Sequence, residues 1–139
     1  KEEIVFEKKN MPEEFLYFQK EGLCGALVHL MPPISKAGKE IRDNTVSQLI
    51  NTMNNCEEKT AFIAGDFNAT PWSSPLLRLK QQGFHTGSHV LPTWPTFFYK
   101  FIGIPIDHIL IKNNHTFSRY EVINPENNSD HYSLIAEIN

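Results

Sequence analysis

AFIAGDFNATPW, residues 61–72, is the stretch around which the rest of the chain is organised. Its first four residues are apolar, which predicts a short buried strand. Pro71 cannot continue a central strand, so the strand must end before it. Because side chains alternate along a strand, Asp66 and Asn68 are expected to point to one side and Phe67 to the other. The stretch therefore predicts a strand that presents a carboxylate and a carboxamide at its C-terminal end.

Two interpretations of Asp66 and Asn68 remain open from these residues alone. A carboxylate that accepts protons or holds a cation, beside an amide that donates and accepts hydrogen bonds, suits a phosphate site. Asp and Asn also bond readily to their own backbone, so the same residues are typical of a strand end closed by an Asx-turn.

Composition predicts one folded domain over residues 1–139. The chain has 139 residues, of which 40% are hydrophobic and 21% charged, so a packed core is expected. Its net charge is −3 and it contains no run of five basic residues. This balance argues against a dedicated nucleic-acid binder, but not against an enzyme in which metal ions meet the phosphate.

Cysteine use and hydropathy give further expectations. Cys24 and Cys56 lack CxxC spacing, so we expect either free buried thiols or cysteines with no particular role. No apolar run approaches the roughly 18 residues that span a membrane, and no signal peptide is visible. The chain begins at Lys1 rather than Met, which favours a piece of a longer protein.

Strands and helices alternate along the chain without repeats, which predicts an α/β or α+β fold. Ser35 is the expected N-cap of a helix over residues 35–55, in which Ile41, Val46, Leu49, Ile50 and Met53 recur at helical spacing. A short helix is expected over 75–79. The expected strands, with a hairpin between the second and third, cover residues 4–6, 15–18, 24–28, 106–111, 117–123 and 132–138, together with the strand that begins with the apolar run 61–64 and presents Asp66 and Asn68.

Polar side chains occur at the ends of several predicted buried strands: His29, Asp66 with Asn68, Asp107, and Asp130 with His131. Asp107 follows Ile106 and precedes an apolar run, and burying a carboxylate is costly unless a group pairs with it. His131 is an available partner. His108 should face away from Asp107, and we interpret it as structural.

Each of these residues could have a purely structural role, but together they supply the groups that a catalytic site needs. Asp66 offers a general base, Asn68 an amide for phosphate, Asp107 and His131 an Asp–His pair, and Asp130 a metal carboxylate. This set fits metal-assisted hydrolysis of a phosphoester. A calcium loop, a phosphate-binding loop and a zinc motif are excluded because their required residues are missing.

Several motifs, in this order, resemble the endonuclease/exonuclease/phosphatase superfamily with the deoxyribonuclease I-like fold. They are Gly65-Asp66-Phe67-Asn68, Pro105-Ile106-Asp107-His108 and Ser129-Asp130-His131. HLMPP at 29–33 and PTWP at 92–95 make the chain more similar to the bacterial YafD-like branch, whose members often carry membrane helices. The resemblance implies a four-layer αββα sandwich with mostly antiparallel or mixed sheets.

The resemblance also implies a role for each site residue. Asp66 would orient or deprotonate the attacking water. Asp107 would orient His131, which would bind the phosphate and stabilise the transition state, and His29 would lie near the phosphate or the leaving oxygen. Asn68 would hold the phosphate and, with Asp130, bind one Mg²⁺ or Mn²⁺ ion.

The chain departs from the family pattern before His29. The early Asn and the Glu that is the family's principal metal ligand have no counterpart there. We therefore expect the C-terminal portion of a larger domain, inactive by itself, with one sheet face left uncovered.

Substrate and partners follow from the same comparison. The expected substrate is a phosphoester of nucleic acid, phospholipid or a small molecule. The expected partners are a second copy bound through the uncovered sheet face and a bacterial membrane reached through a missing segment. The alternative function is a non-catalytic interaction or dimerisation module.

The aromatic segments Pro92–Pro95 and Phe97–Tyr99 lie where substrate loops are expected. Their rings either touch substrate or pack beneath the loop, and the sequence favours packing.

Overall fold

The computed structural model describes residues 15–20, 22–57, 60–87, 90–97, 102–112, 114–124 and 128–139. The predicted strand at residues 4–6 lies outside them. In chain order the elements are β1 (Phe15–Lys20), β2 (Leu23–His29), α1 (Lys36–Asn54), β3 (Thr60–Asp66), α2 (Ser74–Gln81), β4 (Phe84–His85), β5 (Asp107–Lys112), β6 (Phe117–Ile123) and β7 (Ser133–Ile138).

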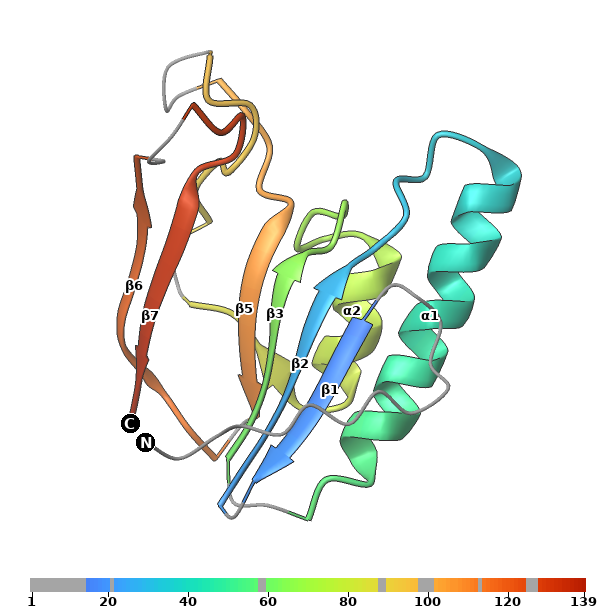
Figure 1. Cartoon of the computed structure of the whole chain (residues 1–139), viewed down its shortest axis with the longest axis vertical. Coiled ribbons are helices and arrows are strands. Elements are labelled where there is room, and N and C mark those ends of the chain that lie inside the picture. The colour runs from blue at the N-terminus through green and yellow to red at the C-terminus, as the bar shows by residue number, and fades with distance from the viewer. Residues whose placement is uncertain are drawn as a thin grey trace.

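The described strands form a five-stranded sheet in the order β1-β2-β3-β5-β4 and a two-stranded sheet of β6 and β7. Among the described strands, only β2 and β3 run parallel, with α1 as their crossover, and the other pairs are antiparallel. The two helices cover one face of the large sheet, and β6–β7 lies beyond β5 on the other side (Figure 1). The predicted mixed α/β architecture with a mixed sheet is confirmed.

Helix α1 begins where the sequence predicts. The Ser35 hydroxyl accepts a hydrogen bond from the Gly38 N–H at 3.0 Å. Leu49 and Met53 are fully buried, whereas Ile41 is 45% exposed and its neighbour Arg42 only 6% exposed. The buried stripe thus passes through Arg42 rather than Ile41. In the part of the chain that is described, no helix combines the length and apolar character needed to cross a membrane.

The core lies between the large sheet and its helices. Alternate side chains of the central strands point toward the helices, as a strand period of two requires. The buried apolar residues that meet there are Cys24, Ala26, Val28, Ala61, Ile63 and Leu110 of the strands and Val46, Leu49, Met53, Leu76 and Leu79 of the helices. This packing holds the C-terminal ends of β2 and β3 in a fixed position.

The prediction of free cysteines is wrong, because Cys24 and Cys56 form a disulfide. Cys24 is the second residue of β2, and Cys56 lies just after α1. The crossover from β2 through α1 to β3 returns the chain to the starting end of β2, which brings the two Cα atoms to 6.4 Å. Sequence spacing contains no trace of this proximity, since it is created by the crossover.

Candidate active site

Three strands place polar side chains at the same level of the sheet. His29 lies opposite Asp66 in the parallel register of β2 and β3, and Asp66 lies opposite Asp107 in the antiparallel register of β3 and β5. Paired residues of neighbouring strands share a face. His29, Asp66 and Asp107 therefore form a row on the face opposite the helices.

Gly65 allows β3 to reach this row. Its φ is +135°, a conformation that favours glycine. A Cβ at this position would collide with the Val28 carbonyl oxygen of β2. The glycine before the acidic residue is thus required by the close approach of two strand backbones.

The chain turns sharply after Asp66. Phe67 is fully buried, and Asn68 adopts a left-handed φ of 44°. The Asn68 N–H donates to Asp66 Oδ1 at 2.7 Å, which is the hydrogen bond of an Asx-turn. The Asn68 side chain nevertheless reaches Asp66 Oδ2 at 3.2 Å. The two interpretations of this stretch are therefore compatible: the Asx-turn itself holds the carboxylate and the carboxamide together.

The Asn68 amide hydrogens are both used within the protein. Its Nδ2 donates to the Leu30 carbonyl oxygen at 2.9 Å as well as to Asp66. Because the amide nitrogen has two hydrogens, the side-chain oxygen is the atom left for another partner. In this arrangement Asn68 is better suited to bind a cation than to donate to a phosphate.

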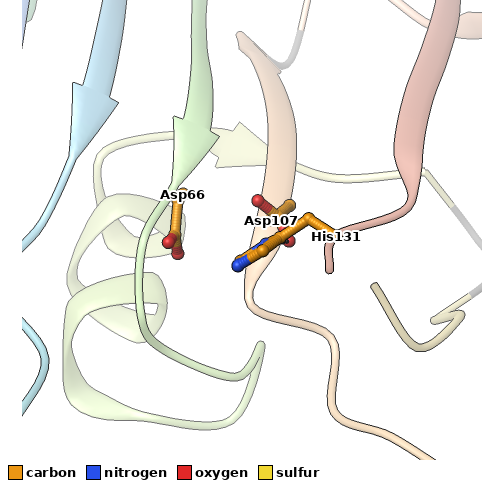
Figure 2. A group of neighbouring side chains, drawn as sticks. All are labelled: Asp66, Asp107 and His131. Carbon is orange, nitrogen blue, oxygen red and sulfur yellow. Dashed lines mark hydrogen bonds and ion pairs between the residues drawn. The ribbon is translucent and has the colours of Figure 1, made fainter. Parts of the chain in front are cut away.

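Asp107 and His131 form the expected pair. His131 Nδ1 lies 2.9 Å from Asp107 Oδ2 and donates to it, since an ionised carboxylate can only accept. Ligand atoms of Asp66, Asp107 and His131 all lie within 4.8 Å of one another. Figure 2 shows the three side chains converging from the end of β3, the start of β5 and the segment before β7.

His29 is the outermost member of the site. Its Nε2 lies 3.7 Å from Asp66 Oδ2, and its side chain is 80% exposed. It can therefore contact a ligand that approaches from solvent and still reach the carboxylate.

The pKa of Asp66 is raised above its usual range, mainly because burial disfavours its charged form. The Asn68 N–H opposes this effect by stabilising the carboxylate. The Asp107 carboxylate adds to the rise, and His131 and His29 act in the opposite direction. A carboxylate with a raised pKa is a better proton acceptor than an exposed one.

Asp130 lies outside this group. Its side chain accepts a hydrogen bond from the Trp94 Nε1–H at 3.2 Å, and the Trp94 ring lies against His131 with 6.5 Å between centroids. The Pro92–Pro95 loop thus packs on the segment that carries His131, as the sequence favoured. Phe97 is 69% exposed, while residues 98 and 99 lie outside the described residues.

His108 has the structural role that the sequence predicts. It is 3% exposed, and its ring packs edge-on against Phe67. Burial lowers the pKa of His108, so the ring is neutral. Its Nε2 lies 2.8 Å from the Ala69 carbonyl oxygen, which fixes the tautomer with Nε2–H as the donor.

Sequence reasoning missed Arg42. This buried side chain extends from α1 toward the turn after β3, where its Nη1 lies 3.5 Å from the Asn68 carbonyl oxygen. The signal was available, because Arg42, Val46, Leu49 and Met53 follow the 3.6-residue period more closely than a stripe that includes Ile41.

The donor set suits a hard divalent cation. The Asp66 carboxylate and the Asn68 side-chain oxygen are oxygen donors of the kind that Mg²⁺ and Mn²⁺ prefer. His131 has one ring nitrogen bound to Asp107, which leaves Nε2 available for a ligand.

Comparison with known proteins identifies the family of the chain. The model of the "Endonuclease/Exonuclease/phosphatase family" matches residues 26–131. No curated protein sequence matches the chain.

Many solved structures are similar to the chain in fold, and three of them illustrate the range. The 3′ phosphatase NExo from Neisseria, bound to product DNA hairpin, has a TM-score of 0.73 and 15% identity, over 98% of this chain and 70% of that one. A functionally unknown conserved protein from Enterococcus faecalis has a TM-score of 0.67 and 19% sequence identity, and the match covers 90% of this chain and 54% of that one. The mannosyl-6-phosphatase from Bacteroides thetaiotaomicron has a TM-score of 0.60 and 15% sequence identity, and the match covers 89% of this chain and 55% of that one.

These likenesses confirm the deoxyribonuclease I-like fold. The chain spans about half the length of the Enterococcus and Bacteroides proteins.

Proposed function

We propose that this chain, which belongs to the Endonuclease/Exonuclease/phosphatase family, carries the acid–base half of a divalent-metal-dependent phosphoester hydrolase site. The observation that carries the proposal is the Asp107–His131 hydrogen bond of 2.9 Å with the Asp66 carboxylate beside it. Three distant parts of the chain contribute these groups.

Asp66 acts as the base toward the attacking water. Its raised pKa makes the carboxylate a stronger proton acceptor, and the Asn68 N–H holds one of its oxygens in place. The other oxygen faces His29 and Asn68 and lies at the open side of the site.

His131 binds the phosphate and stabilises the negative charge that develops in the transition state. Asp107 holds the ring by its Nδ1–H, and the Nε2–H of the doubly protonated ring would donate to the phosphate oxygens. His29 assists at the phosphate or the leaving oxygen from the exposed end of β2.

Asn68 and Asp130 would contribute to holding Mg²⁺ or Mn²⁺, and such an ion would supply neutralisation of phosphate charge and polarisation of the phosphoryl oxygen. Support comes from the Asn68 side-chain oxygen, which accepts no hydrogen bond from the described residues, whereas its Nδ2 donates to Leu30 and Asp66. Asp130 Oδ2 accepts from the Trp94 indole N–H, and a carboxylate with two oxygens can accept this hydrogen bond and still hold a cation.

We also propose that the family's principal metal-binding Glu lies beyond these 139 residues, in a longer protein related to the YafD-like branch and anchored to a bacterial membrane. The chain spans 54% of the similar Enterococcus protein, which supports a larger catalytic domain. By itself the chain then binds the metal weakly and is nearly inactive.

The substrate class is a phosphoester, and similar structures include a 3′ phosphatase bound to DNA and a mannosyl-6-phosphatase. The net charge of −3 favours a substrate other than long duplex DNA.

The test compares the protein at its natural length with the 139-residue chain. Both are assayed with Mg²⁺ or Mn²⁺ on a 3′-phosphorylated oligonucleotide, a phosphoinositide, a sphingolipid and a sugar phosphate. We expect metal-dependent hydrolysis by the natural-length protein, lowered about 10²- to 10⁴-fold by Asp66→Asn. Glu137→Gln, at an exposed carboxylate of β7, is the matched control.

Equal activity of the wild type and Asp66→Asn would remove Asp66 from the mechanism. Mg²⁺-dependent activity of the 139-residue chain would contradict the proposal that its principal metal ligand lies elsewhere.

A second candidate, a non-catalytic dimerisation module, is favoured by one observation. Leu16 and Leu27 are paired on β1 and β2, face away from the helices, and are 47% and 42% exposed. A natural-length protein that hydrolyses no phosphoester of the panel would support this candidate.

A further inference from the structure

We propose that Thr93 is a positioning residue that sets the geometry of the Asp107–His131 pair, an inference that rests on the proposed function. Thr93 lies in the Pro92–Pro95 loop, away from both partners in sequence. It is 1% exposed, so its polar atoms must be satisfied within the protein.

The Thr93 side chain holds the start of β5. Its Oγ1 accepts from the N–H of Ile106 at 3.0 Å and from the N–H of Asp107 at 3.1 Å. The hydroxyl itself points to the Ile104 carbonyl oxygen at 3.5 Å. Two acceptances and one donation use the full capacity of a hydroxyl group. The backbone of Asp107 is therefore held by a side chain rather than by a neighbouring strand alone.

The Thr93 backbone holds the other partner of the pair. Its carbonyl oxygen accepts from the N–H of Tyr132 at 2.8 Å, directly after His131. Thr96, the residue directly after this loop, holds the other side of His131, since its N–H donates to the Asp130 carbonyl oxygen at 2.9 Å. His131 thus lies between two residues whose backbones are held by Thr93 and Thr96.

Thr93 is the residue at which both attachments meet. The N–H groups of Ile106, Asp107 and Tyr132 all donate to atoms of Thr93. The backbones next to both members of the pair are therefore held by one amino acid. Groups that orient the residues of a site typically affect function by about 10- to 100-fold when they are removed. A misplacement of about 1 Å at a catalytic group has a similar effect.

The test removes the Thr93 hydroxyl and reads the pair directly. Thr93→Val keeps the shape of the side chain without its hydroxyl, Thr93→Ala is a second variant in case Val does not fold, and Thr93→Ser restores the hydroxyl. Thr45→Val is the matched control, because Thr45 is equally buried but donates within α1, to the Ile41 carbonyl oxygen.

The first readout is hydrogen exchange by nuclear magnetic resonance, which requires no activity. We expect the His131 Nδ1–H and the amides of Ile106 and Asp107 to exchange at least about tenfold faster in Thr93→Val or Thr93→Ala. Thr93→Ser and Thr45→Val should retain the wild-type rates. Unchanged exchange of the His131 Nδ1–H in both hydroxyl-free variants would overturn the proposal.

The second readout separates this inference from the proposed function. In the natural-length protein, Thr93→Val should lower kcat about 10- to 100-fold with little change in KM, and Thr93→Ser should restore it. If His131→Ala and Asp66→Asn keep full activity, the proposed function fails whatever Thr93 does. If those variants lose activity while Thr93→Val keeps kcat and slow exchange, only the positioning role fails.

Discussion

At the scale of single residues, the site depends on how individual carboxylates and rings are held. Asp66 is partly buried and close to Asp107, yet the Asn68 N–H fixes its ionised form in one orientation. His108 is neutral because it is buried, and it donates to the turn that follows Asp66. Both residues make stability depend on pH, with opposite signs.

Asp66→Asn should stabilise the fold near neutral pH. The pKa of Asp66 in the folded state is raised above the ordinary 3.8, so ionisation of this carboxylate destabilises the folded state. The destabilisation begins as the pH rises above 3.8 and is complete above the folded-state pKa. Asn removes this penalty, so its advantage should be largest near neutral pH and vanish as the pH falls toward 3.8. Urea unfolding across this pH range measures the difference.

Glu137→Gln removes the same formal charge from an exposed site and should stay within about 0.5 kcal/mol of the wild type. An Asp66→Asn variant that is less stable at neutral pH would show that hydrogen bonding to the carboxylate outweighs its burial.

His108→Phe keeps an aromatic ring against Phe67 but leaves the Ala69 carbonyl oxygen without its donor. We expect a loss of about 1–3 kcal/mol in the free energy of unfolding near neutral pH. Because the pKa of His108 is lowered in the folded state, the wild type loses stability as the pH falls below 6.5, and the Phe variant does not share this loss. The difference between the two proteins should therefore shrink in acid. A difference that grows in acid would contradict a neutral, buried His108.

At the scale of elements, the crossover β2–α1–β3 is the unit that builds the site. The C-terminal ends of β2 and β3 carry His29 and Asp66 in register. At the opposite end, the disulfide between Cys24 and Cys56 links the start of β2 to the segment after α1. Helix α1 connects the two ends and buries Arg42 beneath the turn after β3. The Cys24–Cys56 disulfide therefore stabilises the same β2–α1–β3 crossover that carries Asp66.

Replacing both cysteines by Ala should destabilise the chain by about 4 kcal/mol, because the disulfide closes a segment with a sequence separation of 32 residues. Guanidinium unfolding of the variant and of the wild type with and without reductant measures this effect. The reduced wild type should resemble the variant. Thiol titration of the unreduced, denatured wild type should detect no free thiol, and two reactive thiols per chain would contradict the disulfide.

At the scale of the whole molecule, the two faces of the large sheet differ. The helices bury one face, whereas the other carries the exposed pair Leu16 and Leu27 beside the row of site residues. This asymmetry agrees with the expectation of an incompletely covered sheet. An exposed apolar surface of this kind favours association.

The 139-residue chain should therefore form a dimer through β1 and β2. Leu16→Ser with Leu27→Ser should shift sedimentation toward the monomer, since it removes the apolar contact surface. Leu77→Ser is the matched control, because Leu77 is 45% exposed but lies on α2, behind the sheet. A wild type that stays monomeric at high protein concentration would contradict the dimer.

The sequence by itself determined most of the local structure. Apolar periodicity located α1 and the described strands other than the two-residue β4. The Ser35 cap marked the start of α1, and the cost of burying a carboxylate indicated that Asp107 needs a partner such as His131. These features depend on neighbours in sequence or on the chemistry of one residue, so they can be read without the fold.

Only the tertiary structure decided which distant groups meet. The crossover joined Cys24 to Cys56, the strand register aligned His29, Asp66 and Asp107, and the loop at Thr93 connected β5 to the segment of His131. Such contacts arise when strands pair and a crossover closes, and sequence spacing carries no record of either. The chemistry of the site can therefore be predicted from its residues, whereas its geometry is determined by the packing of the sheet.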